Sequence, residues 1–130
     1  MTAKNAMLTA SPQQLGQVLM NLINNAVESI TTAPEFQKKL KENPTFSGDI
    51  FIDTFNQNKE LVIMIKDSGP GIANIDLERI FDPFFTRKKT MGMGVGLSIC
   101  HGIIEDHKGY IVADNDKDGG AVFTITLPLK

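Results

Sequence analysis

The chain has 130 residues, of which 42% are hydrophobic and 22% are charged, so we expect one globular domain with a substantial core. A formal charge of −2 and a pI near 5.6 argue against a general nucleic-acid binder. No hydrophobic run approaches the ~20 residues of a membrane span, and residues 1–10 lack the features of a signal peptide. The single cysteine, Cys100, excludes an internal disulfide and fits a reducing cytoplasm.

A long helix is expected after a short strand or arm at 1–10. Ser11 is a good N-cap, Pro12 suits the first helical position, and Gln14 completes a capping box. Hydrophobic residues then recur at helical spacing and should face the core. They are Leu15, Val18, Leu19, Leu22, Ile23, Ala26 and Ile30.

Three asparagines in five residues are unusual for a helix interior, because the amide competes with the backbone for hydrogen bonds. Asn21 and Asn25 lie on one face, Glu28 flanks the same surface, and Asn24 lies elsewhere. A polar, solvent-facing surface and a binding site both explain this pattern when it is taken alone.

The rest of the chain alternates further helices and strands. We expect a short helix or loop at 34–41, strands at 49–55 and 60–66 joined by a turn at 56–59, a helix at 95–107, and strands at 110–113 and 121–127 around a turn at 115–120. The strands at 49–55 and 60–66 should form an antiparallel hairpin. The predicted fold class is α+β: a two-layer sandwich in which helices cover one face of a mostly antiparallel, mixed sheet.

Two glycine clusters, at 67–72 and 92–97, flank the segment 81–85 and the basic tract 87–89. Glycine lets the backbone turn sharply and approach a ligand closely, and N–H groups that open a helix attract anions. The Gly-Lys-Ser/Thr of a Walker loop is absent, and the evenly spaced glycines at 92–97 do not match a dinucleotide fingerprint. The two clusters together indicate a nucleotide held at both ends, although 92–97 alone could be a flexible loop.

Cys100, His101 and His107 have structural explanations. Cys100 has hydrophobic neighbours and should be an inert core residue. The two histidines are six residues apart on one predicted helix, which places them on different faces, and no paired ligand accompanies them. We expect structural or surface roles for both.

Four ordered motifs carry a family resemblance that extends from about residue 7 to residue 129. These motifs are 17–26, 67–72, 80–85 and 92–97, which look like the N box, the first glycine box, the F box and the second glycine box. The chain resembles the catalytic ATP-binding domain of sensor histidine kinases, within the GHKL superfamily of Bergerat-fold ATPases. The resemblance implies that residues 1–130 form a single catalytic domain.

The resemblance also implies roles for individual residues. Asn25 would bind the Mg²⁺ of Mg-ATP with Asn21 beside it, Asp67 would accept a hydrogen bond from the adenine amino group, and Lys88, in a lid at 81–91, would lie near the phosphates. Asn21, Asn25 and Lys88 would be the catalytic residues. The residues expected to contact the nucleotide are Asn21, Asn25, Asp67, Gly69, Gly71, Ile72, Phe85, Thr86, Lys88, Gly92, Gly94, Val95, Gly96 and Leu97.

Four positions depart from the pattern of the family. Ser68 replaces the commoner Asn, Arg87 replaces a frequent Thr, and Lys108 replaces a frequent Gly at the helix exit. Ala121 stands where Ser or Thr is frequent, so one polar contact on the adenine side would be missing.

Kinase chemistry is favoured over hydrolysis. Hydrolases of the superfamily carry a Glu that activates water where this chain has Asn21, which cannot take a proton. A serine kinase of the anti-sigma-factor type and a regulatory nucleotide-binding module without transfer activity remain alternatives, although 81–85 favours the sensor-kinase branch.

The phosphoacceptor is expected outside this chain, because neither His101 nor His107 is followed by Glu or Asp. The expected partners are ATP or ADP, the histidine-bearing dimerisation domain of the same full-length protein and, indirectly, a response regulator. Neither nucleic acid nor a membrane is expected to contact this domain, and a cytoplasmic location is expected.

Overall fold

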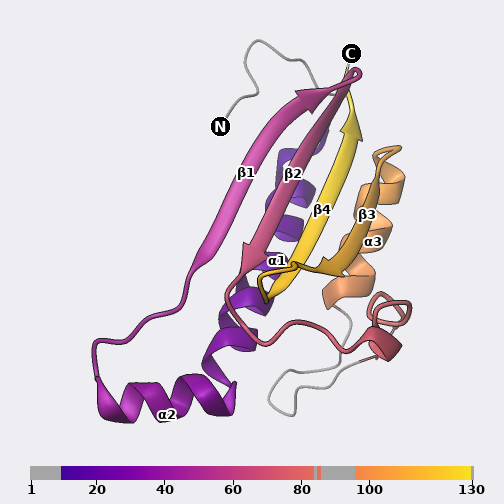
Figure 1. Cartoon of the computed structure of the whole chain (residues 1–130). Helices are drawn as coiled ribbons and strands as arrows, with labels where there is room; N and C mark the ends of the chain where they lie inside the picture. The colour runs from indigo at the N-terminus through magenta and orange to yellow at the C-terminus, as the bar shows by residue number, and fades with distance from the viewer. Residues whose placement is uncertain (1–9, 84, 86–95, 130) are drawn as a thin grey trace.

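The computed structural model describes residues 10–83, 85 and 96–129. Two helices, α1 (Pro12–Thr31) and α3 (Gly96–Asp106), cover one face of a four-stranded sheet, while α2 (Pro34–Glu42) extends to one side (Figure 1). The strand expected at 1–10 and most of the lid and second glycine box lie outside the described residues.

The sheet confirms the predicted α+β sandwich. Its strands are β1 (Ile50–Gln57), β2 (Glu60–Asp67), β3 (Tyr110–Asn115) and β4 (Ala121–Pro128), in the order β1-β2-β4-β3. All three pairings among the described strands are antiparallel. Because β2 and β4 are neighbours, the end of β2 lies beside the start of β4.

The hairpin between β1 and β2 is tighter than the expected turn at 56–59. Pairing continues to Gln57 and Glu60, so the turn consists of Asn58 and Lys59 alone. Both residues have positive φ, 51° and 64°, as a two-residue turn that follows the twist of its strands requires. The strand pattern therefore extends two residues beyond the predicted boundary.

The start of α1 confirms the predicted N-cap but corrects the capping box. The N–H of Gln14 donates to Oγ of Ser11 at 3.2 Å. The N–H of Ser11, which a capping box would pair with the Gln14 side chain, donates instead to Nε2 of His107 at 3.1 Å. Nδ1 of the same ring lies 2.8 Å from the carbonyl oxygen of Ile103. His107 thus ties the end of α3 to the start of α1, which confirms its structural role.

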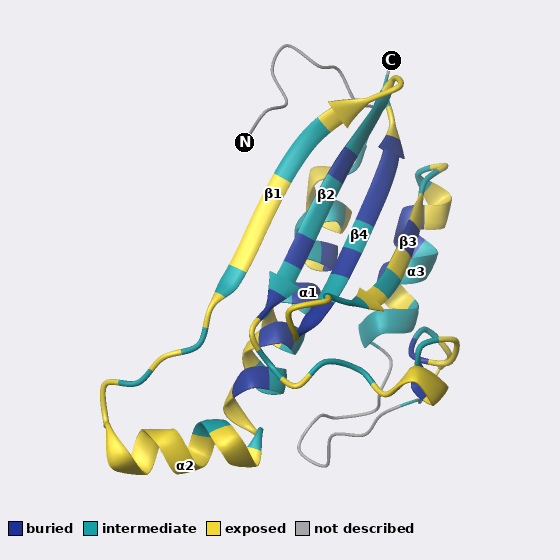
Figure 2. Ribbon diagram, viewed as in Figure 1, coloured by how far each residue is buried: buried dark blue, intermediate teal, exposed yellow. Residues whose placement is uncertain are grey.

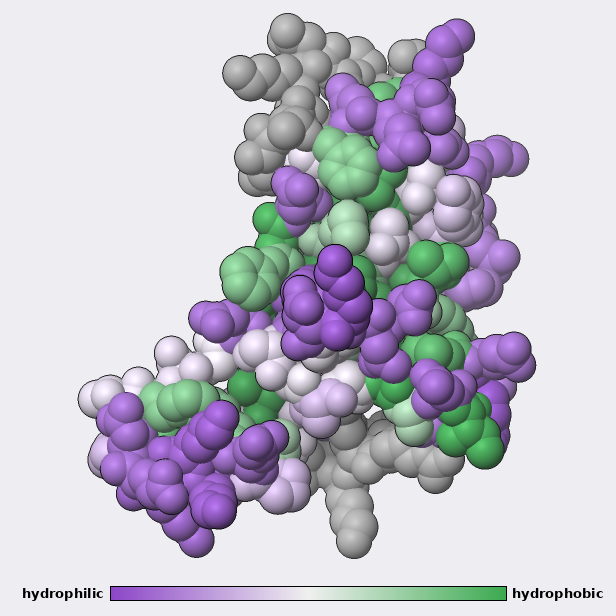
Figure 3. Space-filling model, in the orientation of Figure 1, coloured by the Kyte–Doolittle hydropathy of each residue, from purple (hydrophilic) through white to green (hydrophobic). Residues whose placement is uncertain are grey.

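The ends of α3 and the course of α2 also follow the predictions. Lys108 takes up the left-handed conformation (φ 67°) that glycine usually supplies, and the N–H of Gly109 donates to the carbonyl of Ile104 at 3.0 Å. The helix α2 buries none of its residues, so its lysines form a solvated surface. The large hydrophilic area over α2 is visible in Figure 3.

The core lies between the helices and the sheet. Its most buried side chains come from every layer: Val18 and Leu22 of α1, Cys100 and Ile104 of α3, and Leu127 of β4 are at most 1% exposed. Figure 2 shows these buried segments facing one another across the two layers. The opposite face of the sheet mixes hydrophobic and hydrophilic residues (Figure 3), and no described helix has the length and hydrophobicity needed to cross a membrane.

Candidate functional site

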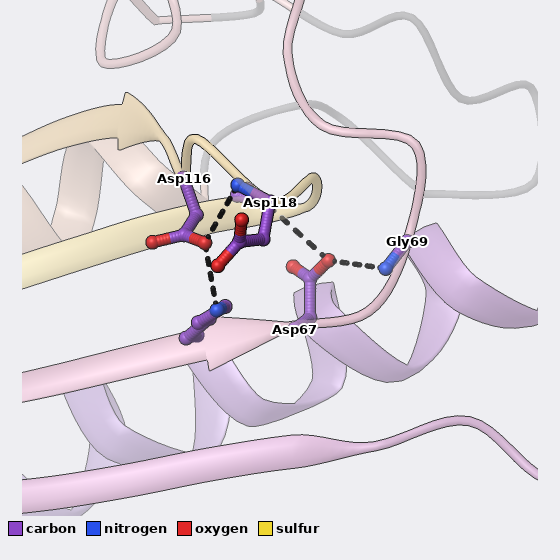
Figure 4. Close-up of polar contacts among 6 residues, drawn as sticks. Asp67, Gly69, Asp116 and Asp118 are labelled. Atoms are coloured by element: carbon purple, nitrogen blue, oxygen red, sulfur yellow. Dashed lines mark hydrogen bonds and ion pairs between the residues drawn. The ribbon is translucent and has the colours of Figure 1, made fainter.

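Asp67, the last residue of β2, is 2% exposed although it carries a carboxylate. Its Oδ1 accepts the N–H of Gly69 at 2.8 Å and faces the N–H of Ala121 at a longer 3.5 Å (Figure 4). The bond to Gly69 is an Asx-type turn, in which the side chain fixes the bend of its own loop. The carboxylate is therefore buried and oriented, as recognition of one defined donor requires.

The loop after Asp67 (residues 68–72), named the adenine loop after the contact that the family resemblance implies for it, is attached to other elements at both ends. Ser68 pairs with Asp49: its Oγ accepts the N–H of Asp49 at 2.8 Å, and its own N–H donates to the Asp49 carbonyl at 3.0 Å. At the other end, Ile72 makes two hydrogen bonds with the side chain of Asn115. The loop is thus attached to the residue before β1 on one side of β2 and to the last residue of β3 on the other side.

Two glycines permit this close packing. Gly71 has φ +85°, and a Cβ there would lie 2.7 Å from Oδ1 of Asn115. Gly120 has φ +88°, and a Cβ there would collide with the carbonyl oxygen of Asp67. A side chain at either position would push the adenine loop away from the β3–β4 turn.

The turn between β3 and β4 is joined to β2 by an ion pair. Nζ of Lys66 lies 2.8 Å from Oδ2 of Asp116, which also accepts the N–H of Asp118 at 3.0 Å (Figure 4). The hydrogen bond from Lys66 holds the pKa of Asp116 below its usual value, and the same bond raises the pKa of Lys66. This pair fixes the turn opposite the adenine loop.

The asparagine face of α1 approaches the same end of β2. Asn21, Asn25 and Glu28 are half-buried, whereas Asn24 is exposed, as their helical spacing predicts. A Cβ on Gly69 would lie 2.8 Å from Oγ of Ser29, so this part of α1 packs against the adenine loop.

Two further contacts characterise this helical face. Burial raises the pKa of the Cys100 thiol, and a hydrogen bond with the Asn21 side chain partly offsets that rise. Cys100 is a buried, free cysteine, as expected. Oε1 of Glu28 is buried and has no hydrogen-bond partner among the described residues.

Phe81 and Phe85 are anchored by aromatic contacts. The Phe81 ring packs edge-on against Phe123, with 6.2 Å between the ring centroids, and its centroid lies 5.4 Å from that of His101. Phe85 is half-buried against the core, with the guanidinium of Arg79 5.5 Å above its ring. Nδ1 of His101 also lies 3.3 Å from Oε1 of Glu105, one turn along α3.

The described residues divide the expected site into two parts. Asp67, Gly69, Gly71 and Ile72 lie at the end of β2, and Asn21 and Asn25 lie on α1, whose Ser29 packs against Gly69. Gly96 and Leu97 open α3, and the side chains of Phe85 and Leu97 pack against the core. Thr86, Lys88, Gly92, Gly94 and Val95 lie outside the described residues. Apart from its chain neighbours and the backbone of its own helix, no atom of the described residues lies within 4 Å of the position that a Cβ on Gly96 would take.

The sequence alone does not identify four residues that surround this site, namely Asn115, Gly120, Lys66 and Asp116. The sequence predicts a turn at 115–120, and the structure has a turn there that begins after Asn115, the last residue of β3. The residue types of this segment, rich in Asp, Asn and Gly, could signal the turn but not the long-range partner of each side chain.

Comparison with known proteins identifies the arrangement. Residues 10–130 match the family described as histidine kinase-, DNA gyrase B-, and HSP90-like ATPase. The chain belongs to this ATPase family. A nucleotide-free form of the catalytic domain of the histidine kinase ThkA is 37% identical, with a TM-score of 0.72 over 93% of this chain and 70% of that one.

Curated relatives of this ATPase-family domain are sensor kinases. The C4-dicarboxylate transport sensor protein DctS of Rhodobacter capsulatus is 38% identical over 87% of this chain, and the sensor histidine kinase ZraS of Salmonella typhimurium is 38% identical over 94%. The chain covers 16% and 23% of these two relatives, less than a quarter of their length. The domain is therefore a histidine kinase catalytic domain of the ATPase family, and ATP is its expected nucleotide.

Proposed function

We propose that this domain binds Mg-ATP and donates the γ-phosphoryl group to a histidine on a dimerisation domain outside the chain, as part of two-component signal transduction. The observation that carries the proposal is Asp67, a buried carboxylate oriented by the N–H of Gly69 at the mouth of a glycine-lined loop. A buried acceptor of this kind selects a ligand that brings a matching donor, which the adenine amino group does and the guanine carbonyl does not.

The residues present fit a magnesium ion. Asn25 would be its protein ligand through the amide oxygen, with Asn21 beside it, and Glu28 adds a buried carboxylate oxygen that lacks a partner among the described residues. These are oxygen donors, which Mg²⁺ prefers, and Mg²⁺ needs few protein ligands because it keeps waters and phosphate oxygens. When bound, the ion would neutralise charge on the phosphates.

The polar residues favour transfer over hydrolysis. A hydrolase needs a base that activates water, but the amide of Asn21 cannot accept a proton. In the structure, His107 bonds to Ser11 and Ile103, and His101 contacts Phe81 and Glu105, so both serve the fold. The chain's own work is therefore to bind and orient ATP for an acceptor histidine located elsewhere.

The phosphate side of the site belongs to the same proposal. Gly94, Gly96 and Leu97 would present N–H groups to the phosphates, and Lys88 would lie near them. Thr86, Gly92 and Val95 would also contact the nucleotide. Phe85, whose ring contacts the guanidinium of Arg79, would anchor the first half of the lid. An ATP-dependent role and a reduced cysteine both suit the cytoplasm, and a response regulator would be the indirect recipient of the phosphoryl group.

The test is transfer from γ-labelled ATP to the dimerisation domain of the full-length protein, supplied as a separate chain. We expect acid-labile label on the partner's histidine and slow release of inorganic phosphate by this domain alone, because positioning provides most of the catalysis of phosphoryl transfer. Rapid hydrolysis without transfer would place the domain among the hydrolases. ATP binding without transfer or hydrolysis would favour a regulatory module.

The metal assignment has a matched pair of variants on one helix. Asn25→Ala should weaken ATP binding in Mg²⁺ far more than in EDTA, because it removes the proposed ligand. Asn24→Ala, about 100° round the helix and exposed, should leave both affinities nearly unchanged. Equal effects of the two substitutions would instead support a merely polar, solvent-facing surface.

A further inference from the structure

The side chain of Asn115 pairs with the backbone of the adenine loop through both of its polar atoms. Oδ1 accepts the N–H of Ile72 at 2.7 Å, and Nδ2 donates to the carbonyl oxygen of Ile72 at 2.6 Å. The two residues are 43 positions apart in sequence. One side chain thus supplies the pair of hydrogen bonds that a neighbouring strand would supply.

This pairing lies directly against the part of the loop that must bend. The Oδ1 atom of Asn115 occupies the space that a Cβ on Gly71 would enter, and Gly120, at the other end of the same turn, packs on the carbonyl of Asp67. The adenine loop is therefore held between the Asx-type turn of Asp67 at one end and the Asn115 amide at the other.

Few side chains can make this pair. An amide carries an acceptor and a donor side by side in one plane, whereas a carboxylate only accepts and a serine hydroxyl offers a single oxygen. Asn115 is half-buried, and its own N–H donates to Oδ1 of Asp114 at 2.8 Å, which fixes the backbone that carries the amide.

We propose that Asn115 is a positioning residue for nucleotide binding: it holds the adenine loop in the shape that presents Asp67 and the loop backbone to the base. Asn115 acts through Ile72 and Gly71. The inference rests on the proposed function, because it concerns the affinity of this loop for an adenine nucleotide.

The sharpest test is Asn115→Asp, which changes one donor into an acceptor at constant shape. At about pH 8 the new carboxylate oxygen should repel the carbonyl oxygen of Ile72, where Nδ2 of Asn115 donates a hydrogen bond in wild type. Because that hydrogen bond is replaced by repulsion, ADP affinity should fall by about tenfold. On acidification the protonated acid regains a donor beside an acceptor, so the affinity relative to wild type should recover to within about twofold. Asn115→Ala should stay weakened at both pH values.

Calorimetric titration with ADP measures these affinities, and each variant is compared with wild type at the same pH. The surrounding elements carry the charged groups Asp67, Lys66, Asp114, Asp116, Lys117 and Asp118. Wild type contains all of them, so the ratio of affinities isolates position 115. Asn56→Asp, at an exposed position of β1, controls for the added charge. Hydrogen exchange of the Ile72 amide should be faster in both Asn115 variants and unchanged in Asn56→Asp.

The outcomes separate the two proposals. If wild type fails to bind ADP, the proposed function is wrong. If wild type binds and both Asn115 variants bind equally well at about pH 8, or if Asn115→Asp shows no recovery in acid, the positioning role of Asn115 is wrong while nucleotide binding stands.

Discussion

At the scale of single residues, Asp67 has the environment that most limits substitution. It is 2% exposed, and its Oδ1 is aligned by the N–H of Gly69 while Gly120 packs on its carbonyl. An isosteric change of this carboxylate therefore alters hydrogen-bond chemistry without creating a cavity. That property makes Asp67→Asn a test of recognition and not merely of packing.

Asp67→Asn should reduce ADP affinity by about tenfold or more. The amide places an NH₂ group either against the adenine amino group or against the N–H of Gly69, and a buried group left unpaired costs about 1–3 kcal/mol. Asp53→Asn, on the exposed part of β1, makes the same charge change and should bind ADP normally. Unchanged binding by Asp67→Asn in calorimetry would refute the assignment of Asp67 to the adenine base.

At the scale of secondary-structure elements, the Lys66–Asp116 pair connects the end of β2 to the β3–β4 turn. Both side chains are about one-third to one-quarter exposed, with 32% and 26% of their surface accessible. Solvent therefore weakens the pair without removing it. The pKa of Asp116 is lowered from its ordinary 3.8 and that of Lys66 is raised from 10.5, chiefly by the hydrogen bond between them.

These shifts give the pair a defined pH window. A lowered carboxyl pKa stabilises the fold above about pH 3.8, and this contribution is lost as the pH falls through the folded-state pKa of Asp116. A raised lysine pKa contributes below about pH 10.5 and is lost as the pH rises through the folded-state pKa of Lys66. Asp116→Asn should therefore lower the melting temperature at neutral pH, and the difference from wild type should shrink at both extremes.

Thermal unfolding followed by circular dichroism measures this difference, with Asp53→Asn as the control for surface charge. A deficit of Asp116→Asn that persists unchanged in acid would assign its effect to packing of the turn and not to the ion pair.

The elements could be predicted from periodicity, but their tertiary hydrogen bonds could not. The spacing of Val18, Leu22 and Ala26 marks the buried face of α1, and alternation marks the strands. The N–H of Ser11 pairs with His107, 96 residues away, and not with the Gln14 side chain, because the fold brings the end of α3 to that point. Local pattern contains no information about such a partner.

At the scale of the whole molecule, the described site is assembled from separate segments: the middle of α1, the adenine loop, and the β3–β4 turn. The asparagine motif and the first glycine motif predicted the first two segments, because the family resemblance assigns both motifs to one nucleotide site. The role of Asn115 could not be predicted for a physical reason: its residue type indicates a turn, and the pairing of β3 with β4 together with that of β4 with β2 brings it to Ile72.

A ligand that bridges these segments should stabilise the entire domain. At a free concentration of about 100 Kd, ADP should add about 2.7 kcal/mol to the free energy of unfolding and raise the melting temperature by roughly 5–10 °C. Asp67→Asn should lose most of this rise at the same ADP concentration. Scanning calorimetry with and without ADP measures it, and an equal rise in both proteins would mean that ADP binds away from Asp67.

The strand order has a consequence for the kinetics of folding. The β1–β2 hairpin closes through a two-residue turn, but Asp67 meets Ala121 only when a loop spanning 54 positions has closed. Closure of a long loop is entropically costly before its contacts form, so the local hairpin is expected to precede the β2–β4 ladder. A chain emerging from the ribosome would thus carry its asparagine helix and hairpin early, yet acquire affinity for nucleotide only after β4 has been synthesised.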